Sequence, residues 1–205
     1  MPAKTVKRES PYLRVGTTIY KRVRQPLSSG RSIEILLAWN VETLRQDFGK
    51  DYLARIPKYD GFCTVPDHTN YRREIHGFLN RYEPIPFQPA EGDFPHIRGF
   101  LSHIFGEQVE MGYDYLQLLY LRPLQRLPVL LLVSSERNTG KTTFLNLLKL
   151  IFGGNVTFNT NEDFRSQFND DWAGKLLICV DEVLLNRRED SERIKNLSTA
   201  RSYKA

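Results

Sequence analysis

The fold is decided by residues 127–151, which read LPVLLLVSSERNTGKTTFLNLLKLI. An apolar run of strand length comes first, a short polar stretch follows, and apolar residues then recur at helical spacing. A helix start leaves backbone N–H groups unpaired and carries a partial positive charge, so it can hold an anion. The order strand, loop and helix therefore predicts a phosphate-binding loop.

The loop carries the residue types that a nucleoside triphosphate requires. Gly140 lets the backbone approach the phosphates, Lys141 reaches the β and γ oxygens, and the Thr142 hydroxyl joins the shell of a Mg²⁺ ion. We expect the cofactor-binding residues to be Ser135, Glu136, Arg137, Asn138, Thr139, Gly140, Lys141, Thr142 and Thr143. The usual pattern has glycine where this chain has Ser135. A surface turn with a chance Gly-Lys-Thr sequence is therefore the alternative.

A second apolar run ends in two carboxylates, because residues 175–182 read KLLICVDE. The carboxyl end of a buried parallel strand points into the site in open α/β sheets. We expect Asp181 to hold the metal and Glu182 to polarise an attacking water. The predicted catalytic residues are Lys141, Asp181 and Glu182, the predicted metal ligands are Thr142 and Asp181, and the predicted cofactors are ATP and Mg²⁺. A strand that merely exits into a polar loop is the alternative.

Composition and charge narrow the class of protein. The chain has 205 residues, of which 40% are hydrophobic and 12% aromatic, enough to bury a core. No apolar stretch approaches the roughly 18 residues of a membrane span, and the first residues lack an apolar signal core. The two cysteines, Cys63 and Cys179, are far apart and suggest no disulfide framework. We therefore expect a soluble, cytoplasmic protein without a membrane partner.

Positive charge is concentrated near the start of the chain. Residues 1–31 carry eight basic side chains and one acidic side chain, a net charge of +7, whereas the whole chain has +5. Such a segment can neutralise nucleic-acid phosphates, and a solvated arm is the alternative. We divide the chain into a basic N-terminal arm (1–31), an aromatic- and proline-rich connector region (32–93) and a P-loop ATPase domain (94–205).

Local patterns predict the elements outside the loop. We expect a short strand or hairpin arm at 12–23, a helix or a strand followed by a helix at 32–48, no long element at 52–93, helices at 95–105 and 112–121, and a strand at 129–133. Five prolines and three glycines between residues 52 and 93 are the reason for expecting only short elements there.

Seven short motifs carry a family resemblance. They lie at residues 94–106, 113–117, 128–132, 138–145, 151–155, 168–173 and 180–182. Together they resemble the primase-helicases of phages, plasmids and mobile elements, which belong to the poxvirus-type branch of helicase superfamily 3. The resemblance implies an α/β P-loop NTPase (AAA+-like) three-layer sheet, preceded by a small α+β or helical region. It also implies ATP hydrolysis in a hexameric homo-oligomeric ring that acts on single-stranded or forked DNA.

The chain departs from this family after the acidic pair. In that family, a strand with a polar sensor residue follows the acidic pair, together with an arginine that reaches across the subunit interface. In the sheet, this sensor strand lies between the strand of the phosphate loop and the strand of the acidic pair. Only 23 residues follow Glu182, and none of them matches these features. We therefore expect a C-terminally truncated domain with an incomplete sheet. Either the two remaining strands pair directly, or a gap leaves apolar surface exposed. Whether this chain alone is an active enzyme stays open.

The main functional hypothesis is the ATP-binding and ATP-hydrolysing motor domain of a DNA helicase (primase-helicase) in the replication of a mobile element. One alternative is a non-catalytic DNA-binding or nucleotide-binding remnant, in which the basic arm matters and the loop is vestigial. The other is a P-loop small-molecule phosphotransferase, which would need an acceptor pocket and a lid.

Overall fold

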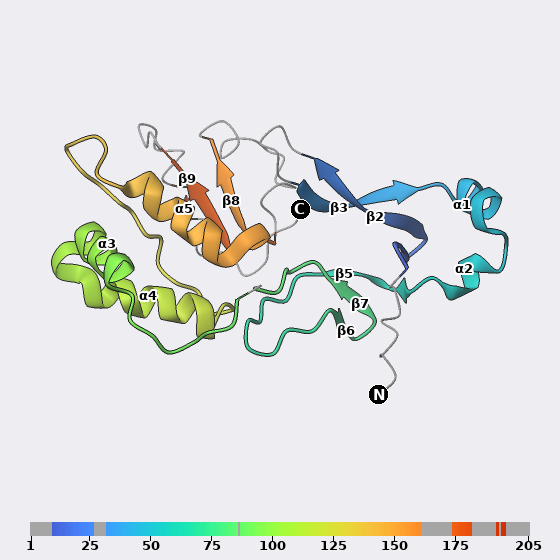
Figure 1. Ribbon diagram of the computed structural model, residues 1–205, viewed down its shortest axis with the longest axis horizontal. Helices are drawn as coiled ribbons and strands as arrows, with labels where there is room; N and C mark the ends of the chain where they lie inside the picture. The colour runs from blue at the N-terminus through green and yellow to red at the C-terminus, as the bar shows by residue number, and fades with distance from the viewer. Residues whose placement is uncertain are drawn as a thin grey trace. The chain divides into compact units, whose positions relative to one another are not determined.

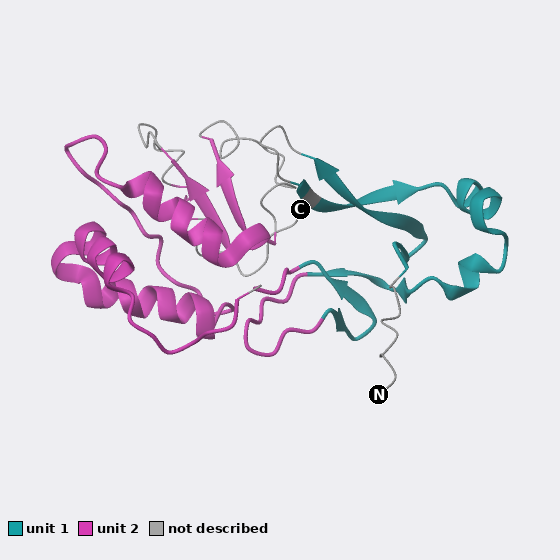
Figure 2. Ribbon diagram, in the orientation of Figure 1, with its two compact units in different colours: residues 1–63, 73–81 teal, residues 64–72, 82–205 magenta. Residues whose placement is uncertain are grey.

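The computed structural model describes residues 10–26, 32–85, 87–160, 174–181, 192, 194 and 195. These parts of the chain form a mixed α/β structure with small sheets and short helices (Figure 1). The chain divides into two compact units, residues 1–63 with 73–81 and residues 64–72 with 82–205 (Figure 2). No helix among the described residues combines the length and the hydrophobicity that a membrane span requires.

The first unit contains seven strands and two helices in its described residues. They are β1 (Tyr12–Val15), β2 (Thr18–Pro26), β3 (Ser32–Trp39), α1 (Val41–Phe48), α2 (Tyr52–Arg55), β4 (Lys58–Tyr59), β5 (Gly61–Cys63), β6 (Glu74–Ile75) and β7 (Phe78–Asn80). These bounds confirm the hairpin predicted at 12–23, the strand followed by a helix at 32–48, and the short elements after residue 52. The Asn40 side chain caps α1, accepting a hydrogen bond of 2.7 Å from the Glu42 backbone N–H.

The main sheet of this unit has hydrophobic side chains on both faces. Its strand order is β3-β2-β1-β4, in which β4 runs parallel to β1 and the other neighbours are antiparallel. Side chains alternate along a strand. Tyr12 and Ile19 accordingly pack with Leu44 of α1, while Leu13 and Val15 pack with Leu79 of β7. The segment predicted as a basic arm thus contributes two core strands in residues 12–26.

The second unit contains the helices around the predicted loop. The elements bounded within its described residues are α3 (Pro95–Phe105), the 3₁₀ helix η1 (Gly106–Gln108), α4 (Val109–Leu121), α5 (Lys141–Phe152), the 3₁₀ helix η2 (Gly153–Asn155), β8 (Val156–Asn159) and β9 (Leu177–Val180). The two helices predicted at 95–105 and 112–121 are confirmed as α3 and α4. Pro95 occupies the first turn of α3, where its missing N–H removes no helical hydrogen bond.

The core of the second unit forms around one face of α5. Phe144, Leu148 and Phe152 are spaced four residues apart, so they lie on one stripe of the helix, and all three are buried. The same cluster contains Leu101 of α3, Leu119 of α4, Val156 of β8 and Cys179 of β9. The Phe105 and Phe144 rings meet edge to face at 5.4 Å. These contacts fix the start of α5 relative to α3 and β9.

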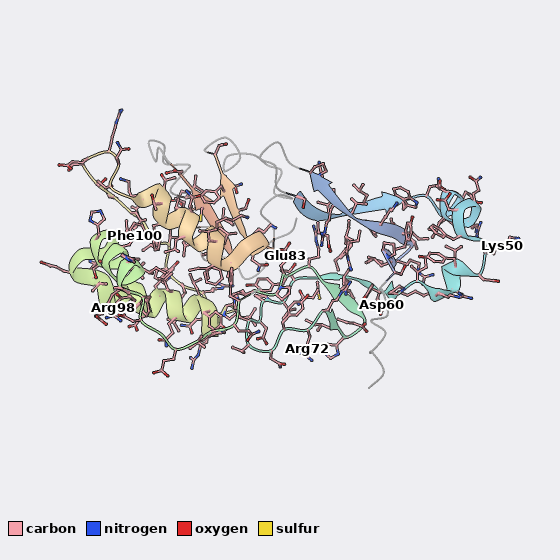
Figure 3. The ribbon with its side chains drawn as sticks, viewed as in Figure 1. Lys50, Asp60, Arg72, Glu83, Arg98 and Phe100 are labelled. Atoms are coloured by element: carbon pink, nitrogen blue, oxygen red, sulfur yellow. The ribbon has the colours of Figure 1, made fainter. Side chains whose placement is uncertain are left out.

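Asn155 anchors the beginning of β8. Its side chain is buried, and its Oδ1 accepts a hydrogen bond of 2.9 Å from the Glu83 backbone N–H while its Nδ2 donates one of 2.8 Å to the Glu83 carbonyl. The Leu176 N–H donates to the Asn155 carbonyl at 2.8 Å. One side chain therefore pairs with both backbone groups of Glu83, which is labelled in Figure 3.

The strand predicted at 129–133 does not form, and the predicted three-layer sheet is not present in the described residues. Among the described strands of this unit, only β8 and β9 pair, and they run parallel. Side chains from residue 129 onward still alternate, since Leu130 and Leu132 pack on the core while Val129, Leu131 and Val133 are 60%, 65% and 80% exposed. A strand needs backbone partners, and this segment has none among the described strands. Among the described residues this segment does not pair with β9, and the exposure of its apolar side chains agrees with the second of the two expectations.

Candidate functional site

Two backbone positions with positive φ shape the loop before α5. Asn138 has φ 58° and Gly140 has φ 86°, and α5 begins at the next residue, Lys141. This left-handed conformation suits glycine and is tolerated by asparagine. A β-carbon on Gly140 would also lie 3.2 Å from a ring carbon of Phe100, which is labelled on α3 in Figure 3. Both conformation and space therefore favour glycine at position 140.

The ammonium group of Lys141 is held by hydroxyl groups of the loop. Its Nζ donates to the Thr139 Oγ1 at 2.8 Å and also to the Ser134 Oγ. The two hydroxyls lie 3.1 Å apart, and the Ser134 hydroxyl also donates to the Glu136 carbonyl at 2.7 Å. The lysine side chain consequently turns back over its own loop. A bound phosphate would meet a cation that is already positioned.

His103 supports the loop from α3. Its Nε2 lies 3.2 Å from the Thr139 carbonyl oxygen, and because a carbonyl only accepts, Nε2 is the donor. Sequence reasoning missed His103 and Ser134. His103 stands 36 residues before Thr139, and no spacing rule links the two. Ser134 lies just outside the loop motif, so only its proximity in the fold shows its role.

Thr142 and Asp181 lie together at the start of α5. The Thr142 hydroxyl donates a hydrogen bond of 2.8 Å to the Asp181 Oδ2 across 39 residues of sequence. Asp181 directly follows β9, whose register with β8 runs from Val156 opposite Leu177 to Asn159 opposite Val180. The buried Cys179 anchors β9 in the core of α5, and burial raises the pKa of its thiol to about 11. The strand thus places one carboxylate at the helix start, and its role as a metal ligand stays a prediction.

The remaining predicted residues are less constrained. Ser135, Glu136, Arg137 and Thr143 have exposed side chains. Glu182 lies outside the described residues, as do residues 168–173 of the resemblance motifs. The described part of the predicted site therefore contains two cationic side chains, Arg137 and Lys141, two carboxylates, Glu136 and Asp181, and several hydroxyl and backbone groups.

The chemistry of this donor set fits Mg²⁺ bound together with a phosphate. Mg²⁺ prefers oxygen ligands and is usually held by one or two carboxylates, substrate phosphates and water. The Thr142 hydroxyl and the Asp181 carboxylate supply two such oxygens within hydrogen-bonding distance of each other. The described residues contain no cluster of three or more His, Cys, Asp or Glu residues able to hold a metal. A metal here would accordingly need ligand oxygens from a bound phosphate.

Comparison with known proteins relates this chain to a phage replication protein. A DNA primase-polymerase of Nitratiruptor phage NrS-1 is 24% identical over 148 residues, which are 69% of this chain and 20% of that protein. A solved apo structure of the NrS-1 C-terminal region (305–718) matches 80% of this chain and 42% of its own, with a TM-score of 0.59 and 21% identity. An A-form apo structure of the same region covers 88% and 45%, with a TM-score of 0.57 and 17% identity.

A protein-family comparison adds one match, since residues 132–205 match a family described as "Family of unknown function (DUF5906)". The solved structures share the fold of this chain, and the chain spans about a fifth of the primase-polymerase that it resembles. The similarity is thus to a part of a larger replication protein.

These comparisons contradict the predicted function. The hypothesis of an ATP-hydrolysing helicase motor of superfamily 3 is wrong, because the matching proteins are a DNA primase-polymerase and its C-terminal region. The two alternatives, a vestigial remnant and a small-molecule phosphotransferase, fit these relatives no better. The broader prediction of a phage-type protein of DNA replication agrees with them. The helicase interpretation came from the resemblance of seven short motifs to one family, and proteins of different function can share such motifs.

Proposed function

We propose that this chain is a nucleotide-binding part of a phage-type DNA replication protein related to primase-polymerases. In this proposal the loop at 134–140, the start of α5 and Asp181 bind the phosphates of a nucleoside triphosphate with Mg²⁺. The loop would then be a variant P-loop with Ser135 in place of the first glycine.

The observation that carries this proposal is the hydrogen bond of 2.8 Å between Thr142 and Asp181. A helix start alone attracts any anion, whereas a carboxylate held beside it repels one unless a cation lies between them. The pair therefore favours a metal-bound phosphate over a free anion. Lys141, held over the loop by Thr139, would supply the second positive charge to the phosphate oxygens.

Each protein group has a distinct role in this site. Backbone N–H groups at the start of α5 would donate to phosphate oxygens, and Lys141 would offset their charge. The hydroxyl oxygen of Thr142 would be a ligand of the metal, and the Asp181 carboxylate would either coordinate the metal or accept a hydrogen bond from a water bound to it. When bound, Mg²⁺ would neutralise phosphate charge and orient the triphosphate.

DNA is the proposed macromolecular partner, because the relative is a DNA primase-polymerase. The net charge of +7 over residues 1–31 supports contact with DNA phosphates. Single-stranded or forked DNA and a ring of identical subunits remain proposals from the family resemblance. Fluorescence anisotropy of labelled single-stranded DNA at increasing salt tests the first, and the mass of the protein in solution tests the second.

The nucleotide proposal is tested by titrating ATP into the chain with Mg²⁺ and with EDTA, using wild type and Asp181→Asn. We expect wild type to bind ATP at least about tenfold more tightly with Mg²⁺ than with EDTA, and Asp181→Asn to lose this difference. The substitution keeps the side-chain size and removes the charge. Binding that depends neither on Mg²⁺ nor on Asp181 would contradict the proposed site.

A further inference from the structure

A cavity of about 360 Å³ adjoins the phosphate loop. Its volume lies within the range of small-molecule pockets, about 300–1,000 Å³. Ser134, Thr139 and Lys141 form part of its wall, and the same three residues make the hydrogen bonds that fix the lysine. A ligand bound at the Lys141 ammonium can therefore extend directly into the cavity.

We infer that this cavity holds the base and sugar of the nucleotide whose phosphates bind at the loop. The inference rests on the proposed function and assigns the cavity to one part of that ligand. A free triphosphate would leave the cavity empty, whereas a nucleoside triphosphate would fill it.

One wall of the cavity is apolar and suits a flat ring. It includes Phe105 and Met111 from the α3–α4 region and Leu131 and Val133 from the segment before the loop. Met111 is 42% exposed and Leu131 65% exposed, so apolar area is available for a ligand to cover. The Phe105 ring is fixed by its edge-to-face contact with the buried Phe144. The part of the wall that Phe105 forms is thus held in place before a ligand binds.

Polar groups at the same cavity can contact a base edge or a ribose. Gln108 contributes a side-chain amide, which has both donors and an acceptor. His103, whose Nε2 donates to the Thr139 carbonyl, contributes a second polar side chain to the cavity. The cavity therefore combines an apolar wall with polar groups, as a nucleoside with a flat ring and polar edges requires. Both groups come from the α3–η1 segment, on the side from which His103 supports the loop.

The test compares Mg·ATP, Mg·dTTP and Mg-tripolyphosphate by calorimetric titration into the full chain. We expect both nucleotides to bind about tenfold more tightly than tripolyphosphate. The double variant Gln108→Ala/Met111→Ala should lose this advantage while its affinity for tripolyphosphate stays that of wild type. Glu110→Ala is the matched control, because Glu110 lies between these residues in sequence and does not line the cavity; it should bind all three ligands as wild type does.

The outcomes separate this inference from the proposed function. If tripolyphosphate binds as tightly as the nucleotides and the double variant changes nothing, the cavity assignment is wrong while the phosphate site stands. If none of the three ligands binds, the proposed function itself fails. A double variant that weakens binding of single-stranded DNA but not of nucleotides would overturn the assignment in favour of a DNA base.

A second readout does not depend on the folding of a variant. Nuclear Overhauser effects between the base protons of ATP and the ¹³C-labelled ε-methyl group of Met111 in the wild-type chain should be visible at saturating ligand. Their absence under conditions in which calorimetry shows bound ATP would overturn the inference.

Discussion

Thr142 at the start of α5 and Asp181 at the end of β9 are joined by a hydrogen bond of 2.8 Å, although 39 residues separate them. Both side chains are exposed, so water competes for each group. A bond of this kind contributes little to folding, since net values are about 0.5–1.5 kcal/mol and exposure lowers them. In the proposed site, it places two oxygens where a metal-bound phosphate would need them.

Thr142→Val should weaken nucleotide binding while leaving the stability of the protein nearly unchanged. The substitution removes the hydroxyl and keeps the side-chain shape. We expect the free energy of unfolding to change by less than about 1 kcal/mol, while Mg·ATP affinity falls by about tenfold or more. Urea unfolding and calorimetric titration of the same preparation measure both quantities. A large loss of stability with unchanged affinity would mean that the pair is structural.

Gly140→Ala should destabilise the second unit. The alanine would have to adopt φ 86°, and its β-carbon would lie 3.2 Å from a ring carbon of Phe100. A strained left-handed residue costs roughly 1–3 kcal/mol. Gly99→Ala is the control, because Gly99 is inside α3 and a β-carbon there meets no atom within 4 Å. Since alanine is the better helix former, Gly99→Ala should stabilise by about 0.5–1 kcal/mol. If urea unfolding shows that the free energy of unfolding changes in the same direction in both variants, the structure described for the loop is contradicted.

Phe144→Ala should remove the central contact of the second core. Phe144 is 0% exposed, and truncating such a phenylalanine costs about 3–5 kcal/mol. Leu150→Ala on the same helix is the control, because Leu150 is 65% exposed and should change stability by less than about 0.5 kcal/mol. Thermal unfolding followed by circular dichroism compares the two. Equal effects would show that α5 does not bury the face described above.

His68 predicts a loss of stability in mild acid. Burial lowers the pKa of His68 below its ordinary value of 6.5, and the charge of Asp67 opposes this only in part. The ring stacks on Tyr120, and its Nε2 lies 3.0 Å from the Tyr82 hydroxyl. The unfolded chain takes up the proton at higher pH than the folded chain. The stability that neutral His68 contributes should therefore be fully present above pH 6.5, and the free energy of unfolding should fall as the pH drops below that value.

The measurement is urea unfolding between pH 7.5 and 5, repeated with His68→Gln. The variant should lose less stability than wild type over this interval, since its side chain does not titrate. Asp67, whose pKa is lowered from 3.8 mainly by the Asn70 backbone N–H, acts only at more acidic pH and does not disturb the comparison. The same slope in both proteins would show that His68 is not the titrating group.

Local patterns predicted the helices and the loop well, because their signals are contained in short segments. Pro95 and Gly106 mark the ends of α3, and Gly140 with Lys141 marks the start of α5. The apolar run before the loop has the pattern of a strand but did not form one, because a strand also needs a neighbouring backbone. Periodicity reports which side chains face the core and says nothing about pairing.

The sequence predicts those residues of the candidate site that belong to a motif. It does not predict the residues that come close to the site only when the chain folds. Lys141, Thr142 and Asp181 follow from their spacing, whereas His103 and Ser134 contribute through contacts with Thr139. The predicted function failed at a different step. The helicase motor was inferred from seven short motifs that resemble one family, and proteins of different function can share such motifs.

The most direct measurement of the nucleotide site is calorimetric titration of Mg·ATP into wild type, Lys141→Ala and the control Lys50→Ala, whose exposed side chain belongs to the first unit. We predict that Lys141→Ala weakens binding by about tenfold or more, while Lys50→Ala matches wild type. Equal affinity of all three proteins for Mg·ATP would mean that the loop before α5 does not bind nucleotide phosphates.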